Sequence, residues 1–388
     1  MITGDSSHVK QINRALILGE IIGHGSISRT DLAKVTGLNK STLSVQAADL
    51  LAEVLIIETY KEHNNPGRKP ILLSLNETAG YALGIDLDGK KMTFVLTNLQ
   101  GVPVSSQLIE FETHNYHEIF RLLVEQIRHY KKRCELAPHG LIGVAIGVHG
   151  IVDNSELICY LPYHQWHNRD LKQDLKDVTG LNIFVENNAN LSAFSEIVFM
   201  HHQSEHLFSL SFNSGIGLGM MVHGEVLKGY NGFAGEIGHM IIIPDGKVCS
   251  CGNSGCWEQY ASEVSLTSSI ARMKKKEKVS LQEIEHWIQV ADPVAIAALE
   301  KYMNYIATGL NNIINLFNPE IMILNNRLLT IYPNALPLLL SKLSSSISQP
   351  CKLLLSELGE KACVMGACAL VIKNFLGVSK LSLSNSRS

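Results

Sequence analysis

The stretch GFAGEIGHMIIIPDGKVCSCGNSGCWEQYAS, residues 232–262, holds the densest group of metal-ligating side chains in the sequence. Three of the eight cysteines, Cys249, Cys251 and Cys256, fall within it, and His239 precedes them. One histidine and three thiolates supply the four ligands of a closed tetrahedral zinc site, and the glycines of CGNSGC allow the tight turns that aim them at one point. Three unrelated buried cysteines near a core histidine are the alternative. The spacing favours a structural zinc ion.

Composition narrows the class of protein. The chain has 388 residues, with 33 Lys and Arg against 36 Asp and Glu, which excludes a polybasic nucleic-acid binder and an acidic disordered chain. Hydrophobic residues make up 46%, but no run of about 18 apolar residues occurs, so no membrane contact is expected. The start, MITGDSSHVKQINRA, lacks the pattern of a signal peptide. We therefore expect a cytoplasmic protein with reduced cysteines.

Residues 1–76 are expected to form a separate winged helix-turn-helix domain. The first helix ends near Gly23 and has an apolar stripe of Ile12, Ala15, Leu16, Gly19 and Ile22. The second begins at Ser28, where Ser28-x-x-Asp31 resembles a capping box. The buried stripe of the third helix is Leu43, Ala47, Leu50, Leu51 and Val54. Two strand-like runs, 55–60 and 71–75, then enclose the segment KEHNNPGRKP, which predicts a hairpin with a basic tip, the shape of a wing.

The placement of polar residues, more than net charge, points to DNA binding by this domain. Lys and Arg exceed Asp and Glu by only one in residues 1–75. The first turns of the third helix, where a recognition helix meets bases and phosphates, carry Lys40, Ser41, Thr42 and Ser44. Arg68 and Lys69 lie at the hairpin tip, where an arginine can enter a narrow A·T minor groove. A winged helix used for protein contacts is the alternative.

From Gly80 onward, strand and helix patterns alternate, which predicts a mixed α/β architecture in two lobes. Strands are expected within 84–101, 141–148, 183–187, 207–222 and 321–324. Helices are expected at 117–132, 293–317 and 365–375. The glycine loop SGIGLG is by itself a weak phosphate-binding signal. Asn187 and Asn188 follow a strand, where open α/β sheets expose ligand-binding groups, although they are equally suited to capping a helix.

Taken in order, these segments resemble the ROK family of repressors and sugar kinases, above all its winged members, over nearly the whole chain. The most specific match is 232–262, with G-E-x-G-H followed by C-x-C-G-x-x-G-C-x-E. Supporting segments are GVHGIVD (147–153), VENNAN (185–190), SGIGLG (214–219), NPEIMIL (318–324) and MGACA (365–369). Among family members, the pattern resembles the xylose repressor group.

The resemblance implies a fold and a domain division. It implies a winged helix-turn-helix followed by a two-lobed ROK domain of the actin-like, ribonuclease-H-like type. Lobe 1 would span 80–190, with a C-terminal helix at 360–378 packing back on it, and lobe 2 would span 191–359 with the zinc site. The tail, 379–388, is expected to be disordered.

The resemblance also assigns site residues. It implies that His239, Cys249, Cys251 and Cys256 hold the zinc ion. It implies sugar binding by Asn187, Glu236, His239 and Glu258, with Gly150 in the loop near the sugar and Asn188 still able to bond a hydroxyl. Zinc would then orient the histidine and shape the sugar pocket rather than perform catalysis.

Three features that the family's kinases need are altered here. The phosphate turn D-x-G-G-T is replaced by Asp86-Leu87-Asp88-Gly89-Lys90, which puts a carboxylate where phosphates approach. Asn188 stands where the catalytic Asp is found, and an amide cannot act as the general base. Asn325-Asn326 replaces two glycines on the adenine side. His149, where the family commonly has Pro, is a smaller departure. The resemblance therefore implies no ATP binding and no enzymatic activity.

Two functions remain. The first is a repressor that binds a palindromic DNA operator as a dimer, or as a dimer of dimers, and responds to xylose or another unphosphorylated sugar. The second is an ATP-dependent sugar kinase with an accessory DNA-binding domain.

Overall fold

The computed structural model describes residues 6–60, 71–343, 345 and 351–383. The chain forms two compact units, each described by itself below. The first comprises Met1–Asn187, Ile197–His202 and Cys363–Ser388, and the second comprises Asn188–Glu196 and Gln203–Ala362. The mixed α/β character expected from the alternating pattern is confirmed.

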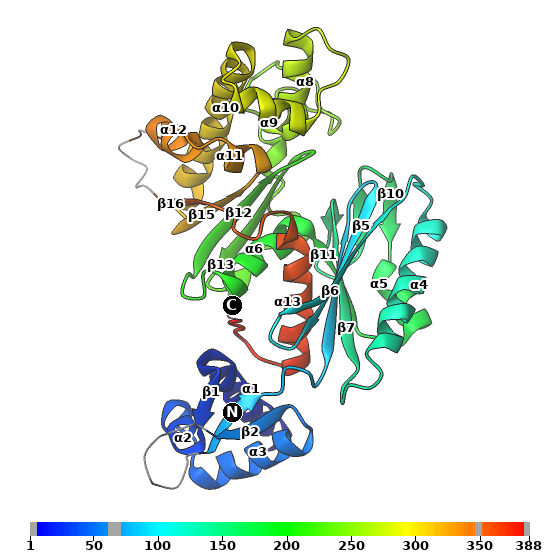
Figure 1. The fold of residues 1–388 in the computed structure, drawn as a ribbon, viewed down its shortest axis with the longest axis vertical. Helices are drawn as coiled ribbons and strands as arrows, with labels where there is room; N and C mark the ends of the chain where they lie inside the picture. The colour runs from blue at the N-terminus through cyan, green and yellow to red at the C-terminus, as the bar shows by residue number, and fades with distance from the viewer. Residues whose placement is uncertain (1–5, 61–70, 344, 346–350, 384–388) are drawn as a thin grey trace. The chain divides into compact units, whose positions relative to one another are not determined.

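The N-terminal part of the first unit contains three helices and a small sheet (Figure 1). Its elements are α1 (Ser6–His24), β1 (Ser26–Ser28), α2 (Arg29–Thr36), α3 (Lys40–Ala52), β2 (Ile56–Tyr60) and β3 (Ile71–Leu75). The sheet order is β1-β3-β2, with antiparallel neighbours. Ser28 caps α2, because its side chain accepts a hydrogen bond from the Asp31 amide at 3.1 Å, as the sequence predicted. β1, with three residues, is too short to show a pattern and was not predicted.

The apolar stripe predicted for α1 is wrong in part, whereas that of α3 is confirmed at Leu43, Ala47 and Leu50 and wrong only at Val54. α1 buries Ile17, Leu18 and Ile21, whereas Ile12 and Leu16 are 53% and 38% exposed. The segment ALILGEII offers more than one apolar stripe, so spacing alone does not choose the face that meets the rest of the fold. Val54 does not continue α3: it lies beyond the helix end, with a left-handed backbone (φ 60°) and 40% exposure.

The larger sheet of the first unit has the order β11-β7-β4-β5-β6. Its strands are β4 (Tyr81–Leu87), β5 (Lys91–Asn98), β6 (Pro103–Glu110), β7 (Leu141–Val148) and β11 (Ile183–Asn187). β11, β7 and β4 run parallel, so their carboxyl ends share one edge. The side chains of α4 (Tyr116–Arg133) and α5 (Leu171–Thr179) share a hydrophobic core with this sheet.

The last helix, α13 (Ala362–Leu376), covers the opposite face of this sheet from α4 and α5 (Figure 1). A Cβ atom on Gly84 of β4 would lie 2.3 Å from the Val364 carbonyl oxygen, so only glycine permits this approach. Beside the sheet, a small antiparallel sheet is formed by β8 (Ile151–Val152), β9 (Ile158–Leu161) and β10 (Trp166–Arg169).

The second unit is built on a sheet of order β14-β13-β12-β15-β16. The strands are β12 (His206–Phe212), β13 (Ile216–Val222), β14 (Glu225–Val226), β15 (Ile321–Asn325) and β16 (Lys352–Leu355). Alternate side chains of β12 and β13 pack into one core with α10 (Pro293–Phe317). Gly219 faces the other way, where a Cβ atom would lie 2.0 Å from the Ala189 carbonyl oxygen of α6 (Asn188–Phe199).

Shorter helices complete this unit. They are η1 (Ile237–His239), α7 (Glu258–Ala261), α8 (Glu263–Met273), α9 (Leu281–Gln289), α11 (Arg327–Ile331), α12 (Ala335–Lys342) and η2 (Gly359–Lys361). None of the helices within the described residues is long and apolar enough to cross a membrane.

The expectation of a disordered tail is wrong for its first part. Leu381 and Leu383 are 3% and 2% exposed, and the Leu383 amide donates a hydrogen bond to the Val198 carbonyl at 2.9 Å. The beginning of the tail is therefore packed against the first unit through these two leucines. Residues 384–388 lie outside the described residues.

Candidate functional site

The four sequence-predicted metal ligands meet in the second unit. His239 is the last residue of η1, and the three cysteines follow in the loop that leads to α7. His239 Nδ1 lies 3.6 Å from Cys249 Sγ, and the sulfur atoms of Cys251 and Cys256 lie 3.6 Å apart. One ligand atom from each of the four residues lies within 4.8 Å of all the others.

These separations match a tetrahedral zinc site. Ligands at about 2.3 Å (sulfur) and about 2.0 Å (nitrogen) from one zinc ion stand about 3.6–3.8 Å apart. A disulfide requires about 2.05 Å between sulfur atoms, so Cys251 and Cys256 are separate thiols. The loop reaches this geometry through Gly255, whose φ is 89° and whose Cβ, if present, would lie 1.7 Å from the Ile243 carbonyl oxygen. The residues present therefore fit zinc.

The thiols differ in acidity. Burial and the neighbouring thiols raise the pKa of Cys256 to about 12, and burial raises that of Cys249. A hydrogen bond from the Asn253 backbone lowers the pKa of Cys251. At neutral pH, a thiolate at Cys256 therefore needs the charge of a bound cation, and metal binding would release protons.

Two of the predicted sugar-binding residues, Glu236 and Glu258, adjoin the candidate metal ligands, and a third, His239, is one of those ligands. Glu258 Oε1 lies 3.6 Å from His239 Nδ1 and accepts a hydrogen bond from Cys249 Sγ at 3.1 Å. Glu236 precedes η1, and burial raises the pKa of its carboxyl, with Glu258 adding to the effect and His239 opposing it. The structure thus groups Glu236, His239 and Glu258 in one polar environment.

A cavity of about 220 Å³ opens beside this group, within the second unit. Glu258 and Gln259 line it together with the predominantly polar face of α8, and Ser214, Lys247 and Arg272 complete much of its wall. Carboxylate, amide and hydroxyl groups of this kind pair well with the hydroxyls of a small polar ligand. Sequence reasoning missed the contribution of α8, because its serines have no distinctive spacing.

In the first unit, the predicted residues Asn187 and Gly150 lie together. Asn187 ends β11, beside Val148 of β7, and its Nδ2 donates a hydrogen bond to the Gly150 carbonyl at 2.9 Å. Asn188 is the first residue of α6 and belongs to the second unit. The parallel strands β7 and β11 thus place Asn187 and Gly150 at one sheet edge.

The turn after β4 is closed by its own side chains. The Gly89 amide, which a phosphate would need, donates to Asp88 Oδ1 at 2.6 Å. His149 Nε2 lies 2.9 Å from Asp86 Oδ1, and its Nδ1 lies 3.9 Å from Asp88 Oδ1. Burial lowers the pKa of His149, but the two carboxylates outweigh burial and raise it overall. Sequence reasoning noted His149 only as a replacement for Pro, because its partners are about sixty residues away.

The two asparagines at the end of β15, Asn325 and Asn326, also form hydrogen bonds within the protein. Asn326 is 2% exposed, donates from Nδ2 to the Phe212 carbonyl at 2.9 Å and accepts from the Leu329 amide at 3.0 Å, which caps α11. Asn325 Nδ2 donates to the Gly359 carbonyl at 2.8 Å. Both side chains therefore form hydrogen bonds that a glycine at the same position could not form.

The predicted DNA-contacting residues of α3 begin that helix. Asn39 caps it, accepting a hydrogen bond from the Thr42 amide at 2.8 Å. Lys40, Ser41 and Ser44 are exposed and Thr42 is half-buried. Val45 of the same helix is 59% exposed and was not predicted as a contact residue. Its position outside the buried apolar stripe is the feature of the sequence that could have identified it. Arg68 and Lys69 lie outside the described residues.

Among residues 6–60, only Lys40 of the Lys and Arg side chains has no carboxylate partner within 4.0 Å. Each of the others forms an ion pair: Lys10 with Asp49, Arg14 with Glu53, Arg29 with Glu58 and Lys34 with Asp31. Lys40 is therefore the positive charge of this region left for an external anion.

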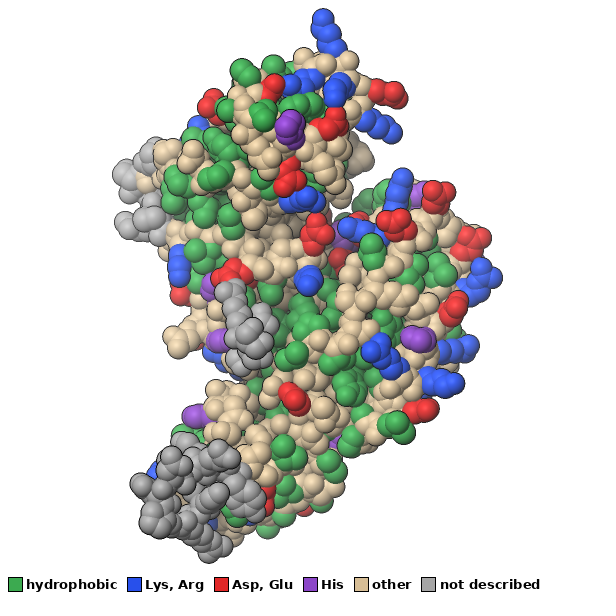
Figure 2. All heavy atoms as spheres, viewed as in Figure 1, with side chains coloured by type: hydrophobic (Ala, Val, Ile, Leu, Met, Phe, Trp, Pro, Cys, Tyr) green, Lys and Arg blue, Asp and Glu red, His purple; other side chains and the backbone are tan. Residues whose placement is uncertain are grey.

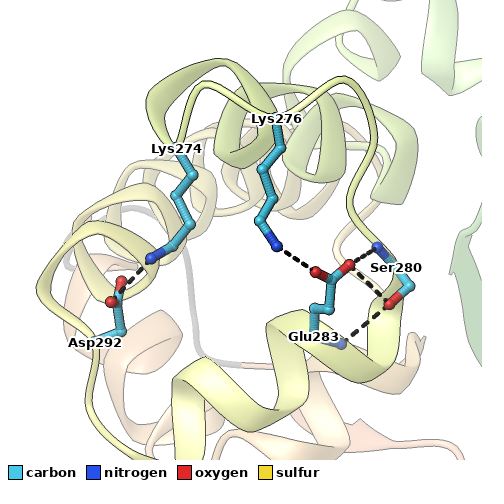
Figure 3. Close-up of polar contacts among 5 residues, drawn as sticks. All are labelled: Lys274, Lys276, Ser280, Glu283 and Asp292. Atoms are coloured by element: carbon cyan, nitrogen blue, oxygen red, sulfur yellow. Dashed lines mark hydrogen bonds and ion pairs between the residues drawn. The ribbon is translucent and has the colours of Figure 1, made fainter.

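Two of the five basic residues in the run at 272–278 pair with acidic neighbours (Figure 3), whereas Arg272, Lys275 and Lys278 are exposed. Lys274 pairs with Asp292 at 2.9 Å and Lys276 with Glu283 at 2.6 Å. Both ammonium groups also lie over the Trp287 ring, 4.2 and 5.1 Å from its centroid. On the face drawn in Figure 2, acidic and basic side chains are interspersed rather than gathered into one basic patch.

Together, the fold and the site define a two-lobed α/β protein of the sugar-kinase type. The ROK family model matches residues 82–374, and the chain belongs to the ROK family. The xylose repressor of Bacillus spizizenii is 36% identical over 386 residues, which cover 98% of this chain and all of that protein.

Solved structures agree with this assignment. A ROK family transcriptional regulator, a homologue of the Escherichia coli MLC protein, matches with a TM-score of 0.81 at 26% identity, over 95% of this chain and 97% of that one. A ROK glucokinase from Streptomyces griseus, in complex with glucose and AMPPNP, matches with a TM-score of 0.66 at 23% identity, over 75% of this chain and 99% of that one, which shows the shared fold.

Proposed function

We propose that this protein is a sugar-responsive transcriptional repressor that does not phosphorylate its effector. Residues 1–76 form the winged helix-turn-helix that binds a palindromic operator, and the ROK domain binds an unphosphorylated, xylose-like sugar. The full-length match to a xylose repressor supports both parts. The observation that most supports the proposal is structural. The chain combines an N-terminal three-helix region with a kinase-like fold, and in the turn after β4 of that fold Asp88 bonds the Gly89 amide and Asp86 pairs with His149.

The DNA-binding part of the proposal rests on α3. Lys40 contacts a phosphate, since it alone of the basic residues in 6–60 has no carboxylate partner. Ser41, Thr42 and Ser44 contact phosphates or base edges from the same turns. Arg68 and Lys69 act from the wing tip. Val45 adds an exposed apolar side chain suited to a thymine methyl group.

The sugar-binding part rests on Glu236, His239, Glu258 and Asn188 of the second unit. The family resemblance adds Asn187 and Gly150, which lie together in the first unit. A structural zinc ion held by His239, Cys249, Cys251 and Cys256 fixes the histidine ring. Because Nδ1 of His239 faces Cys249, Nε2 is the nitrogen left for a sugar hydroxyl. The zinc ion contributes rigidity, not catalysis.

The absence of kinase activity follows from the same contacts. A nucleotide phosphate at the β4 turn would have to displace Asp88 from the Gly89 amide against the repulsion of two carboxylates. Asn188 cannot accept the proton of an attacking hydroxyl, and general-base catalysis is worth about 10²–10⁴-fold. We therefore propose that ATP is not a cofactor.

The two-fold symmetry of a palindromic operator determines the oligomeric state that we propose. One small head offers few base contacts, so the repressor binds DNA as a dimer or a dimer of dimers, in the cytoplasm. The proposal includes a DNA-binding domain at 1–76, a first ROK lobe at 80–190 with the helix at 360–378, and a second lobe at 191–359.

Sugar binding is tested by thermal unfolding against a panel of pentoses and hexoses. A ligand that binds only the folded state raises the melting temperature in proportion to RT ln(1 + [L]/Kd). We expect a shift with xylose or a related free sugar, its loss in Glu236→Ala, and its retention in Glu300→Ala, a control at an exposed glutamate of α10. A panel without any shift would contradict the sugar-sensor proposal.

The alternative function is a sugar kinase with an accessory DNA-binding domain, which the match to the glucokinase fold keeps open. ATP consumption with each sugar separates the two. Turnover above background that disappears in Glu236→Ala would establish the kinase and overturn the non-enzymatic proposal.

A further inference from the structure

A second group of metal-ligating side chains lies in the second unit, at the end of the sheet where β12 begins. Glu205, His206 and His223 each offer one ligand atom, and these atoms lie within 4.8 Å of one another. His223 Nδ1 is 3.8 Å from Glu205 Oε2, and the two imidazole centroids are 4.7 Å apart. Within the described part of the chain, this is the one such group besides His239 and the three cysteines.

The backbone holds these residues in place. β12 and β13 pair in unbroken antiparallel register from His206 opposite Val222 to Phe212 opposite Ile216. Glu205 and His223 are the next residues beyond the last pair, so they face each other across the strand ends. The Gly224 amide donates a hydrogen bond to the Glu205 carbonyl at 3.3 Å, which ties the turn to the start of β12.

The turn itself carries an unusual residue. Val222 pairs with Glu225 in the β13–β14 hairpin, so His223 and Gly224 are its two central residues. Their φ values are 53° and 75°, which is the type I′ pattern that favours Asn-Gly. A histidine in left-handed backbone is strained relative to glycine, and such outliers cluster at functional sites. The imidazole placed there reaches both Glu205 and His206.

We propose that Glu205, His206 and His223 bind a divalent transition-metal ion, at a site separate from the cysteine site. Two imidazoles and one carboxylate suit Zn²⁺, Ni²⁺ or Co²⁺, whereas Mg²⁺ and Ca²⁺ prefer oxygen ligands. Three protein ligands leave coordination positions for water. The ion crosslinks the β13–β14 turn to the start of β12. This site does not depend on the proposed repressor function.

Calorimetric titration with Ni²⁺ tests the site in the full-length, zinc-loaded protein. We expect the wild-type chain to bind one Ni²⁺ per chain at this site. His223→Asn keeps a residue that suits the type I′ turn and removes the imidazole, so it should fold normally and bind Ni²⁺ at least about tenfold more weakly. Glu205→Gln should weaken binding as well. Zinc content measured before and after titration excludes exchange at the cysteine site.

The matched control is His286→Asn, which removes an exposed histidine from α9. It should bind Ni²⁺ like the wild type. A second readout is thermal: Ni²⁺ should raise the melting temperature of the wild type and of His286→Asn but not of His223→Asn. The proposal is overturned if the wild type binds no Ni²⁺, if His223→Asn binds as tightly as the wild type, or if His286→Asn loses binding equally.

Discussion

Two polar clusters of this protein differ in whether the charges of their members are balanced within the cluster. In the turn after β4, Asp88 bonds the Gly89 amide and Asp86 bonds His149, so the cluster is complete without a ligand. In the second unit, a histidine and three cysteines converge to within 4.8 Å, and they need a cation to carry thiolate charge. The first cluster stands where a kinase would receive phosphates, and the second stands beside the proposed sugar residues. The thiols of the second cluster also contact one another, His239 and Glu258, but these contacts supply no positive charge, so the cluster still suits a cation, whereas the paired carboxylates of the first cluster oppose a phosphate.

Removing a ligand from the converging cluster should have the largest effect. Cys256→Ser should abolish zinc binding and lower the free energy of unfolding by several kcal/mol, because structural metal binding is coupled to folding. Elemental analysis and thermal unfolding measure the two effects. Cys159→Ser, at a half-buried cysteine outside the cluster, is the control. Wild-type protein with well under one zinc per chain would refute the metal site.

Replacing the buried carboxyl of Glu196, which accepts a hydrogen bond from Ser356, should have the next largest effect on stability. Burial raises the pKa of Glu196 in α6 to about 7, although Ser356 donates to it at 2.5 Å. Because the pKa in the folded protein exceeds the ordinary glutamate pKa of 4.5, the stabilisation is fully present below pH 4.5 and is lost as pH rises through 7. The loss is about 3 kcal/mol by pH 8.

Glu196→Gln should remove this loss, so urea unfolding at pH 5 and pH 8 should give nearly equal stabilities where the wild type loses stability at pH 8. Ser356→Ala leaves the carboxyl in place without its donor and should raise its pKa further. An unchanged pH dependence in Glu196→Gln would show that this carboxyl does not titrate in the expected range.

The proposed DNA-binding region, residues 6–60, also contains paired and unpaired charges: Lys34 pairs with Asp31, whereas Lys40 has no carboxylate partner among these residues. Lys40→Ala should weaken operator binding and lower the slope of log K against log salt concentration by about 1 per head. Lys34→Ala, where the lysine pairs with Asp31 at 2.8 Å, is the matched control and should change the slope little. Fluorescence anisotropy across a salt series measures both. Equal slopes for the wild type and Lys40→Ala would remove Lys40 from the interface.

The smallest expected effect, on ATP turnover, tests the cluster of Asp86, Asp88 and His149 in the turn after β4. Asn188→Asp places a carboxylate at the position that we propose to correspond to the kinase base, but we expect no ATP turnover, because Asp86 and Asp88 should still repel a phosphate at the β4 turn. A second variant, which adds Asp88→Gly and His149→Pro to Asn188→Asp, opens the turn and is the one in which turnover should first be measurable. Turnover in Asn188→Asp alone would show that the paired side chains do not block the nucleotide.

The sequence predicted what depends on local spacing. The four candidate metal ligands lie close together in the chain, and α4 and α10 have clear helical periodicity, so the convergence of these ligands and the two helices could be predicted. The buried face of α1 was not, because ALILGEII offers two apolar stripes and only packing chooses between them. The pair of His149 with Asp86, 63 residues apart, has no local signal. Short strands such as β1 and β14 give too few residues for a pattern.

The return of α13 to the first unit has a consequence for biosynthesis. The sheet that begins with β4 receives Val364 and Cys368 against Gly84 only after almost the whole chain has been made. Domains usually fold in order as they leave the ribosome. Here the unit that is synthesised first is completed last, so a nascent chain arrested before residue 362 exposes one apolar face of that sheet. Premature termination near the C-terminus should therefore yield chains that aggregate rather than shortened repressors.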